Sequence, residues 1–460
     1  MSALRRLAAA VRLTEGRLYT VAIGLASAVL LAVATVPAAR DWRATPTGAE
    51  DTIAGSNAGG VPVRPRPLTA SKQGVTADAI KVGVVLLDLS SAEPLGLGLK
   101  NYQVALQKAA FEAYFRRVND AGGINGRRIQ PVYASRDTLA QSGPHSEAAI
   151  CIRMAKDEKV FALIGYLVAA GSCAAIQHGI PAVQQQGVHE REFRESNNAI
   201  ITSQRSPERT GRDWARALVE TRLADGHKVG LLSIGDGTTE NLGALAAEKE
   251  LTALGHPVAM HVQISPSNAL TDLQVAVRNM KNAGVDHVMF SAPFLIAVQF
   301  VTFAEDQNYR PRYLTSDLGA LANDGPLRRA PDSLDGAIGF TSSSLLPAGQ
   351  KEAPAVEACR LEFNARTGGK DIAAGEESPV ITICGVTEML VRAARAAGTD
   401  LTTRSLVEAA QRLPVTSLPG VLDGSFGPGK TDFTDGLRPV RYSARCHCWL
   451  PAGDPLHLAP

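Results

Sequence analysis

The chain has 460 residues, of which 45% are hydrophobic, and a formal net charge of +2. This length provides room for two or three domains with sizeable cores. The near-neutral charge and the lack of a long basic run give no electrostatic footprint for nucleic acid, which is therefore not expected as a partner.

The first 39 residues predict export. Four arginines within residues 1–17 precede an uncharged stretch, residues 18–39, in which Val36-Pro37-Ala38 resembles a small-residue cleavage site. The uncharged stretch is also long enough to cross a bilayer as a helix, so a cleaved signal peptide and a retained anchor both stay open. Either alternative places the rest of the chain outside the cell. Residues 40–78 show no hydrophobic period and are rich in proline and glycine, which predicts a flexible tether.

A strand–helix–strand unit follows the tether. Residues 80–87 are almost continuously apolar and β-branched, as expected of a parallel strand buried on both faces. A helical pattern with Val104, Phe111, Phe115 and Val118 on one side then runs to a pair of glycines at 122–123, and a second strand is expected at 129–133. The crossover between the two strands should be right-handed.

The amino-acid sequence of this unit resembles that of a known protein family. The run Asn119-Asp120-Ala121-Gly122-Gly123-Ile124-Asn125-Gly126-Arg127-Arg128-Ile129, behind an Ile-Lys-Val-Gly-Val strand, is similar to the leucine/isoleucine/valine-binding family of solute-binding proteins. These proteins are extracytoplasmic ligand receptors of ABC importers. The resemblance implies an α/β fold of the type I periplasmic-binding-protein kind, with two lobes. Each lobe would be a doubly wound, mostly parallel sheet, and hinge crossings would join the lobes.

After residue 133 strands and helices keep alternating, as in parallel, doubly wound sheets. With the crossings implied by the resemblance, we expect lobe 1 to contain residues 79–204 and 341–424. Lobe 2 should contain residues 205–340 and 425–450, with a C-terminal tail at 451–460.

One string fits the phosphate-loop pattern: Gly424-Ser425-Phe426-Gly427-Pro428-Gly429-Lys430-Thr431. Phosphate binding there would need a buried strand before the string and a helix after it. The flanking residues are instead typical of turns, so we interpret the string as a solvated loop near the last crossing between the lobes.

Six cysteines, all at or beyond position 151, suggest disulfide bonds in an exported chain, although spacing alone permits fifteen connectivities. Cys151 with Cys173 resembles a disulfide of the first lobe in some family members, and Cys359 with Cys384 is the other pairing we favour. Cys446 and Cys448 flank His447, which also suggests metal, but no partner pair with zinc spacing exists. A disulfide is therefore preferred there and no metal site is expected.

Candidate binding residues lie in loops at the carboxyl ends of strands, where open α/β sheets bind ligands. The resemblance implies that hydroxyl and backbone N–H groups of lobe 1 hold an amino acid's carboxylate, and that aromatic rings and an acid of lobe 2 hold its ammonium. By position, the candidates in lobe 1 are Ser90, Ser91, Tyr166, Ser172 and Gln184. In lobe 2 they are Asp236, Thr238, Ser291, Phe294 and Asp317, with Asp317 as the main candidate for the acid. A helix N-cap role for Ser172 or Asp317 and a core role for Phe294 are the alternatives.

The resemblance therefore implies a receptor that closes around a small solute, an amino acid or a related amide, and presents it to an ABC permease as a monomer, without a cofactor. A membrane-tethered sensor or scavenger is the first alternative. An amide or peptide hydrolase is a remote one, because no nucleophile–base constellation is visible.

Overall fold

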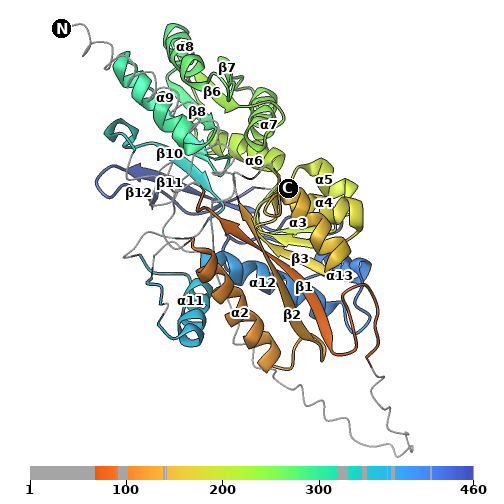
Figure 1. Ribbon diagram of the computed structural model, residues 1–460. Coiled ribbons are helices and arrows are strands. Elements are labelled where there is room, and N and C mark those ends of the chain that lie inside the picture. The colour runs from red at the N-terminus through yellow and green to blue at the C-terminus, as the bar shows by residue number, and fades with distance from the viewer. Residues whose placement is uncertain are drawn as a thin grey trace, which may run out of the picture.

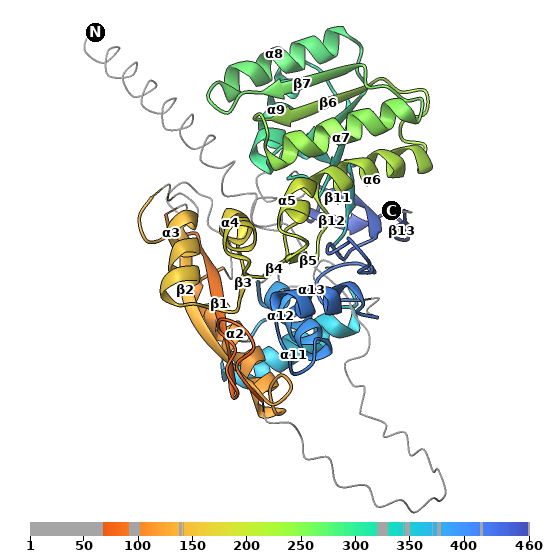
Figure 2. The ribbon, with the colours of Figure 1, turned by 90° about the vertical axis from the view of Figure 1, so that its right-hand side faces the viewer.

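The computed structural model describes residues 68–91, 102–137, 140, 142–319, 330–343, 345, 350–369, 371–374, 379–414 and 417–458. The expected signal peptide or anchor at 1–39 and the tether up to residue 67 lie outside these residues. Within the described residues, no helix is long and apolar enough to cross a membrane. Figures 1 and 2 show two lobes, with α8 and β6 in one and α2 and β1 in the other.

The sheet of lobe 1 has five parallel strands among the described residues, in the order β2-β1-β3-β4-β5. The strands are β1 (Ala79–Asp88), β2 (Arg128–Asp137), β3 (Ala162–Gly165), β4 (Ala182–Gln184) and β5 (Ile200–Thr202). The helices of this lobe are α2 (Val104–Asp120), α3 (Glu147–Ile152) with its π-helical extension η2 (Arg153–Asp157), α4 (Val168–His178), α5 (Glu190–Glu195), α11 (Pro354–Thr367), α12 (Pro379–Ala396) and α13 (Thr403–Gln411).

Both faces of this sheet are covered, which explains the continuous apolar run of β1. Val82 and Val84 point into a core shared with α2, α11 and α12. Val85, on the opposite face, packs in a second core with α3 and α4. Alternate residues of one strand thus enter two different cores. Figure 2 shows α11, α12 and α13 beside lobe 1 although they follow lobe 2 in the sequence.

Lobe 2 contains a mixed sheet of eight strands among the described residues, in the order β12-β11-β10-β9-β8-β6-β7, with β13 paired to β11. The strands are β6 (Val229–Ile234), β7 (Met260–Ile264), β8 (His287–Ser291), β9 (Arg312–Ser316), β10 (Ile338–Thr341), β11 (Gly436–Ser443), β12 (Cys448–Pro451) and β13 (Leu456–His457). The helical segments are α6 (Pro207–Glu220), α7 (Thr239–Ala253), α8 (Ala269–Asn282), α9 (Phe294–Asp306) and the short η3 (Asp332–Leu334). β6 to β10 pair in parallel, whereas β11 pairs antiparallel with β10, β12 and β13. The two-lobed α/β fold expected from the sequence is therefore confirmed.

The connections between the lobes lie side by side. The backbone N–H of Thr202 donates to the carbonyl of Thr431 at 2.8 Å, and the N–H of Phe433 donates back to the carbonyl of Thr202 at 2.9 Å. The N–H of Leu422 donates to the carbonyl of Ser342 at 2.8 Å, which ties the connection after β10 to the last one. Because the connections share hydrogen bonds, they form a common strap between the lobes.

Two expected boundaries differ in the structure. The end of the expected tether packs on lobe 1: Val75 is 2% exposed within its core, and the Ser71 hydroxyl donates to the Leu401 carbonyl at 2.7 Å. The expected C-terminal tail contributes β13, and Leu458 is buried in lobe 2. The sequence did not reveal these packed segments because each contributes only a few residues to the core of its lobe. Neither segment therefore has a long hydrophobic period.

All six cysteines form disulfide bonds. Cys151–Cys173 joins α3 to α4, Cys359–Cys384 joins α11 to α12, and Cys446–Cys448 closes a short loop that ends at the first residue of β12. The two pairings favoured from the sequence are therefore present in lobe 1, and the Cys-His-Cys string has no free thiols for a metal.

Candidate functional site

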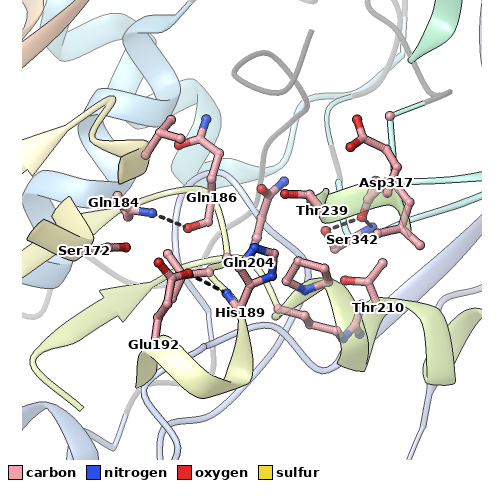
Figure 3. A pocket seen from close by; sticks show the side chains of 18 of the residues that line it. Ser172, Gln184, Gln186, His189, Glu192, Gln204, Thr210, Thr239, Asp317 and Ser342 are labelled. Carbon is pink, nitrogen blue, oxygen red and sulfur yellow. Dashed lines mark hydrogen bonds between the residues drawn. The ribbon is translucent and has the colours of Figure 1, made fainter. Parts of the chain in front are cut away.

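A cavity of about 220 Å³ lies between the lobes (Figure 3). Its lobe 1 wall comes from the start of α4, the end of β4 and the segment leading into α5. Its other wall comes from the first crossing, the start of α7 and the loops after β9 and β10. Because parallel strands end at the same edge of a sheet, the two sheets present their carboxyl ends to one shared space. The volume suits a small organic molecule.

Three of the ten candidate residues line this cavity: Ser172, Gln184 and Asp317. Figure 3 shows Ser172 and Gln184 on the elements of lobe 1, opposite Asp317. Gln184 is fully buried, and its Nε2 donates to the Gln186 carbonyl at 2.8 Å, while its Oε1 has no donor among the described residues.

Asp317 also fastens the ends of β9 and β10 together. Its Oδ1 accepts from the Thr341 hydroxyl at 2.7 Å, and its Oδ2 accepts from both the backbone N–H and the hydroxyl of Ser342 at 2.6 Å. These three bonds hold the carboxylate in one orientation at the cavity wall. Asp317 therefore has a structural role as well as a place in the cavity.

Four candidates lie outside the cavity wall formed by the described residues. The Ser90 hydroxyl donates to Asp88, and the Ser91 hydroxyl donates to Asp137. Asp236 is exposed. Thr238 is the N-cap of α7, where its hydroxyl oxygen accepts from the Asn241 N–H at 3.1 Å. Its neighbours Thr239 and Glu240 line the cavity in its place.

The remaining three candidates are buried behind the wall. Tyr166 is 2% exposed at the end of β3, and Phe294 is 1% exposed in the core of lobe 2. Ser291 is fully buried, and its hydroxyl donates to the backbone carbonyl of Glu240 at 2.6 Å, which fixes the first turn of α7. For Phe294 the structure favours the core alternative, because α9 begins there and turns the ring inward.

The structure adds wall residues that the sequence reasoning did not select: Gln186, His189, Glu192, Gln204, Arg205, Thr210, Thr239, Glu240 and Ser342. The run Gln184-Gln185-Gln186 directly after a buried strand was a usable signal, because three consecutive amides at a strand end predict a polar wall. The crossing residues carried no such signal, since no strand-end position marks them.

Gly187 explains how the wall is assembled. A Cβ on this residue would lie 1.7 Å from the backbone carbonyl oxygen of Arg205, so only glycine allows the loop after β4 to touch the first crossing. This contact brings the amides that follow β4 next to Arg205. His189 and Glu192 then start α5 with a capping box, in which Glu192 Oε2 accepts from the His189 N–H at 3.0 Å.

Arg205 lies in the crossing between β5 and α6 and is 4% exposed. Its Nε is 3.0 Å from Oδ2 of Asp213, and its Nη2 donates to the Gly436 carbonyl at 2.8 Å. Its Nη1 is buried and has no acceptor among the described residues. Burial lowers the pKa of this guanidinium, which nevertheless stays charged because arginine cannot deprotonate in proteins.

Glu240, in the first turn of α7, is 2% exposed. Its Oε1 has no donor among the described residues. Burial raises the pKa of its carboxyl to about 7, and no basic group is among the causes of this shift. The cavity wall thus contains a buried acid that has not been neutralised by a protein cation.

The phosphate-loop string lies in the last crossing and not before a helix: β11 follows it. The Lys430 ammonium donates to the backbone carbonyls of Ser425, Asp432 and Phe433. The lysine that would contact phosphate is thus committed to the loop itself, as the interpretation from the sequence requires.

Comparisons with known proteins agree with this architecture. The sequence pattern of the family described as periplasmic binding protein matches residues 79–437. No curated protein matches the sequence. The fold is similar to a solute-binding protein of an ABC transporter from R. palustris in complex with 4-hydroxybenzoate, with a TM-score of 0.61 and 16% identity, over 83% of this chain and 98% of that one.

Two further structures have different ligands in their titles. A leucine-binding protein from Thermotoga maritima MSB8 has a TM-score of 0.61 and 14% identity, over 82% of this chain and 99% of that one. A fatty acid ABC transporter substrate-binding protein from Thermomonospora curvata has a TM-score of 0.58 and 16% identity, over 85% of this chain and 95% of that one. At these identities the structures share the fold. Since the family pattern spans well over half of the sequence, the chain belongs to the periplasmic binding protein family and is a binding protein rather than an enzyme.

Proposed function

We propose that this protein is a receptor on the outer side of the cell membrane that binds a small polar solute between its lobes and delivers it to an ABC permease. Within the family we place it with the leucine/isoleucine/valine-binding group, as a monomer whose solute is an amino acid or a related amide. Residues 18–39 would direct export, either as a cleaved signal or as an anchor.

The observation that carries this proposal is the cavity itself. Both lobes contribute to its walls, so closing the lobes removes a bound molecule from water. The shared strap between the lobes is a set of loop segments, which is the usual place for hinge bending. The amides of Gln184, Gln186 and Gln204 provide both donors and acceptors, as a polar solute requires.

A thermal-shift screen tests the proposal, because a solute that binds only the native state raises the melting temperature. The screen should include amino acids, amides, short peptides, sugars, aromatic acids and fatty acids. We expect a member of the amino acid or amide group to give the largest shift, with a dissociation constant then measured by calorimetry.

A blocking variant shows whether binding occurs in the cavity. Ala169 is an exposed alanine at the start of α4 that lines the cavity, so Ala169→Trp should fill the space without disturbing a core. The matched control is Ala253→Trp, at an exposed position at the end of α7. Loss of the shift in Ala169→Trp alone supports the proposal. No shift with any solute, or equal shifts in both variants, overturns it.

A further inference from the structure

Arg205 and Glu240 are two residues of the cavity wall that are at most 4% exposed and have a charged side chain with an atom that lacks a hydrogen-bond partner among the described residues. We propose that Arg205 and Glu240 are the two charge anchors of the cavity: Arg205 binds the anionic group of the solute, and Glu240 binds its cationic group. The solute is therefore amphoteric, with a carboxylate and an amine. This inference rests on the proposed function and names residues and charges for the same cavity.

Arg205 is prepared for an anion before the solute arrives. Its Nη2 donates a hydrogen bond to the Gly436 carbonyl at 2.8 Å, and Asp213 forms an ion pair with the guanidinium at 3.0 Å from Nε, so little side-chain freedom remains to be lost on binding. Nη1 has no acceptor among the described residues and belongs to a residue of the cavity wall. A buried N–H of a charged group without an acceptor is unfavourable, and a carboxylate oxygen is the acceptor that best matches a guanidinium.

Glu240 is an acid of the cavity wall that lacks a basic partner among the described residues, just as Arg205 has a nitrogen that lacks an acceptor. Its carboxyl is buried in the cavity wall, no ion pair joins it to Arg205 or to another cation in the described part of the chain, and Oε1 lacks a donor. Asp317, the acid expected from the sequence, already accepts three hydrogen bonds from Thr341 and Ser342. Between the two acids, Glu240 therefore has the larger unmet demand for a donor.

The charges of the whole wall favour a solute with both signs. Glu192, Glu240 and Asp317 line the cavity together with Arg205 and His189. A purely anionic solute would meet three acids, and a purely cationic one would leave Nη1 of Arg205 without an acceptor. A solute with both groups satisfies both residues, because each buried charge then has a partner.

The test compares solutes that differ in one charged group. L-Leucine, L-glutamine and L-phenylalanine are each titrated by calorimetry beside the analogue without the amine and the analogue without the carboxylate. The proteins are the wild type, Arg205→Gln and Glu240→Gln. Arg278→Gln and Glu220→Gln, at exposed helix positions away from the cavity, are the matched controls.

We expect wild-type protein to bind at least one of the amino acids at least about 30-fold more tightly than either of its analogues. Arg205→Gln should abolish the preference for the carboxylate and keep the preference for the amine, and Glu240→Gln should do the reverse. Each readout is the ratio of the affinities of two solutes for one protein. A general loss of folding would weaken both affinities and would not change this ratio.

The contrary outcomes separate the two proposals. Equal ratios in wild type and both variants overturn the assignment of the anchors while the receptor function stands. Tight binding of a neutral sugar or a fatty acid, with no binding of the amino acids, overturns the amphoteric solute and again leaves the receptor function intact. Binding of no solute of any class overturns the receptor function and this inference with it.

Discussion

The two walls of the cavity differ in how their polar groups are satisfied. The wall of lobe 1 contributes neutral side chains, Ser172, Gln184 and Gln186, and its acid Glu192 is used in a helix cap. The opposite wall contributes Arg205 and Glu240, which are buried with unmet hydrogen-bonding capacity. The side chains of lobe 1 named here are therefore neutral or already hydrogen-bonded, whereas the opposite wall, which includes the first crossing, contains the two buried charged residues that we propose as anchors.

The largest effect should come from the group that supports the charged wall. Asp213 is 2% exposed and lies within 3.0 Å of Arg205, 3.7 Å of Arg209 and 3.6 Å of Arg216. Asp213→Ala leaves these guanidinium groups without their shared carboxylate, so the free energy of unfolding should fall by about 3–5 kcal/mol. Urea denaturation at pH 7 measures the change.

Asp306→Ala, at an exposed aspartate of α9, is the control and should change the same free energy by less than about 0.5 kcal/mol. If both variants unfold at the same urea concentration as wild type, Arg205 does not depend on Asp213 and the contrast between the walls disappears.

The second prediction concerns Glu240, whose replacement should raise the free energy of unfolding by an amount that depends on pH. The folded protein raises the pKa of Glu240 from 4.5 to about 7, so it binds this proton more tightly than the unfolded chain does. The free energy of unfolding should therefore fall as pH rises from about 4.5 to about 7 and level off above that, with a total loss of roughly 3 kcal/mol for this group by pH 8. Glu240→Gln removes the cost, so the variant should be the more stable protein at pH 8 and close to wild type below pH 4.5.

Urea denaturation of both proteins across pH 5 to 8 gives the difference directly. A difference that stays constant over this range would show that Glu240 does not titrate as a buried, unpaired acid. A solute that brings an amine to Glu240 should also reduce the pH dependence, since the carboxylate would then have a partner.

The smallest effects belong to the wall of lobe 1. Ser172 is 8% exposed and lines the cavity from α4, and Ser172→Ala removes one neutral hydroxyl. We expect solute binding to weaken by about 1 kcal/mol or less, because a hydrogen bond between neutral groups contributes little net free energy. Calorimetry with the solute found in the screen measures it. A loss as large as that of Arg205→Gln would mean that charge selection is shared by both walls.

The fold was readable from the sequence because its signals are local. The apolar run of β1 and the paired glycines after α2 predict a buried strand and a helix end without reference to the rest of the chain. Only some residues of the cavity wall could be selected from the sequence. Strand-end position selects Gln184 and Asp317, which line the cavity, but it selects Ser90 and Asp236 equally, and the twist of the sheets decides which strand ends meet.

The two charge anchors could not be identified by the same reasoning. Arg205 is one of several arginines near the first crossing, and the others, such as Arg209 and Arg212, are paired with acids in the fold. What distinguishes Arg205 is its place in the cavity wall together with a buried Nη1 that has no acceptor among the described residues, and both depend on packing in three dimensions. Glu240 is likewise distinguished from Glu248 and Glu250 of the same helix by its burial and by the lack of a basic partner among the described residues, whereas Glu248 pairs with His261 and Glu250 with Arg216.

A fluorescent dye attached to the strap between the lobes would turn the protein into an optical sensor of lobe movement. Pro428 is an exposed residue in the turn of the last crossing, two residues before Lys430, whose ammonium donates to backbone carbonyls of this loop. All six cysteines are in disulfides, so Pro428→Cys would add a single reactive thiol for a dye. Because this crossing is hydrogen-bonded to β5, a dye at position 428 would report bending between the lobes as a change in fluorescence, without any labelling of the cavity itself.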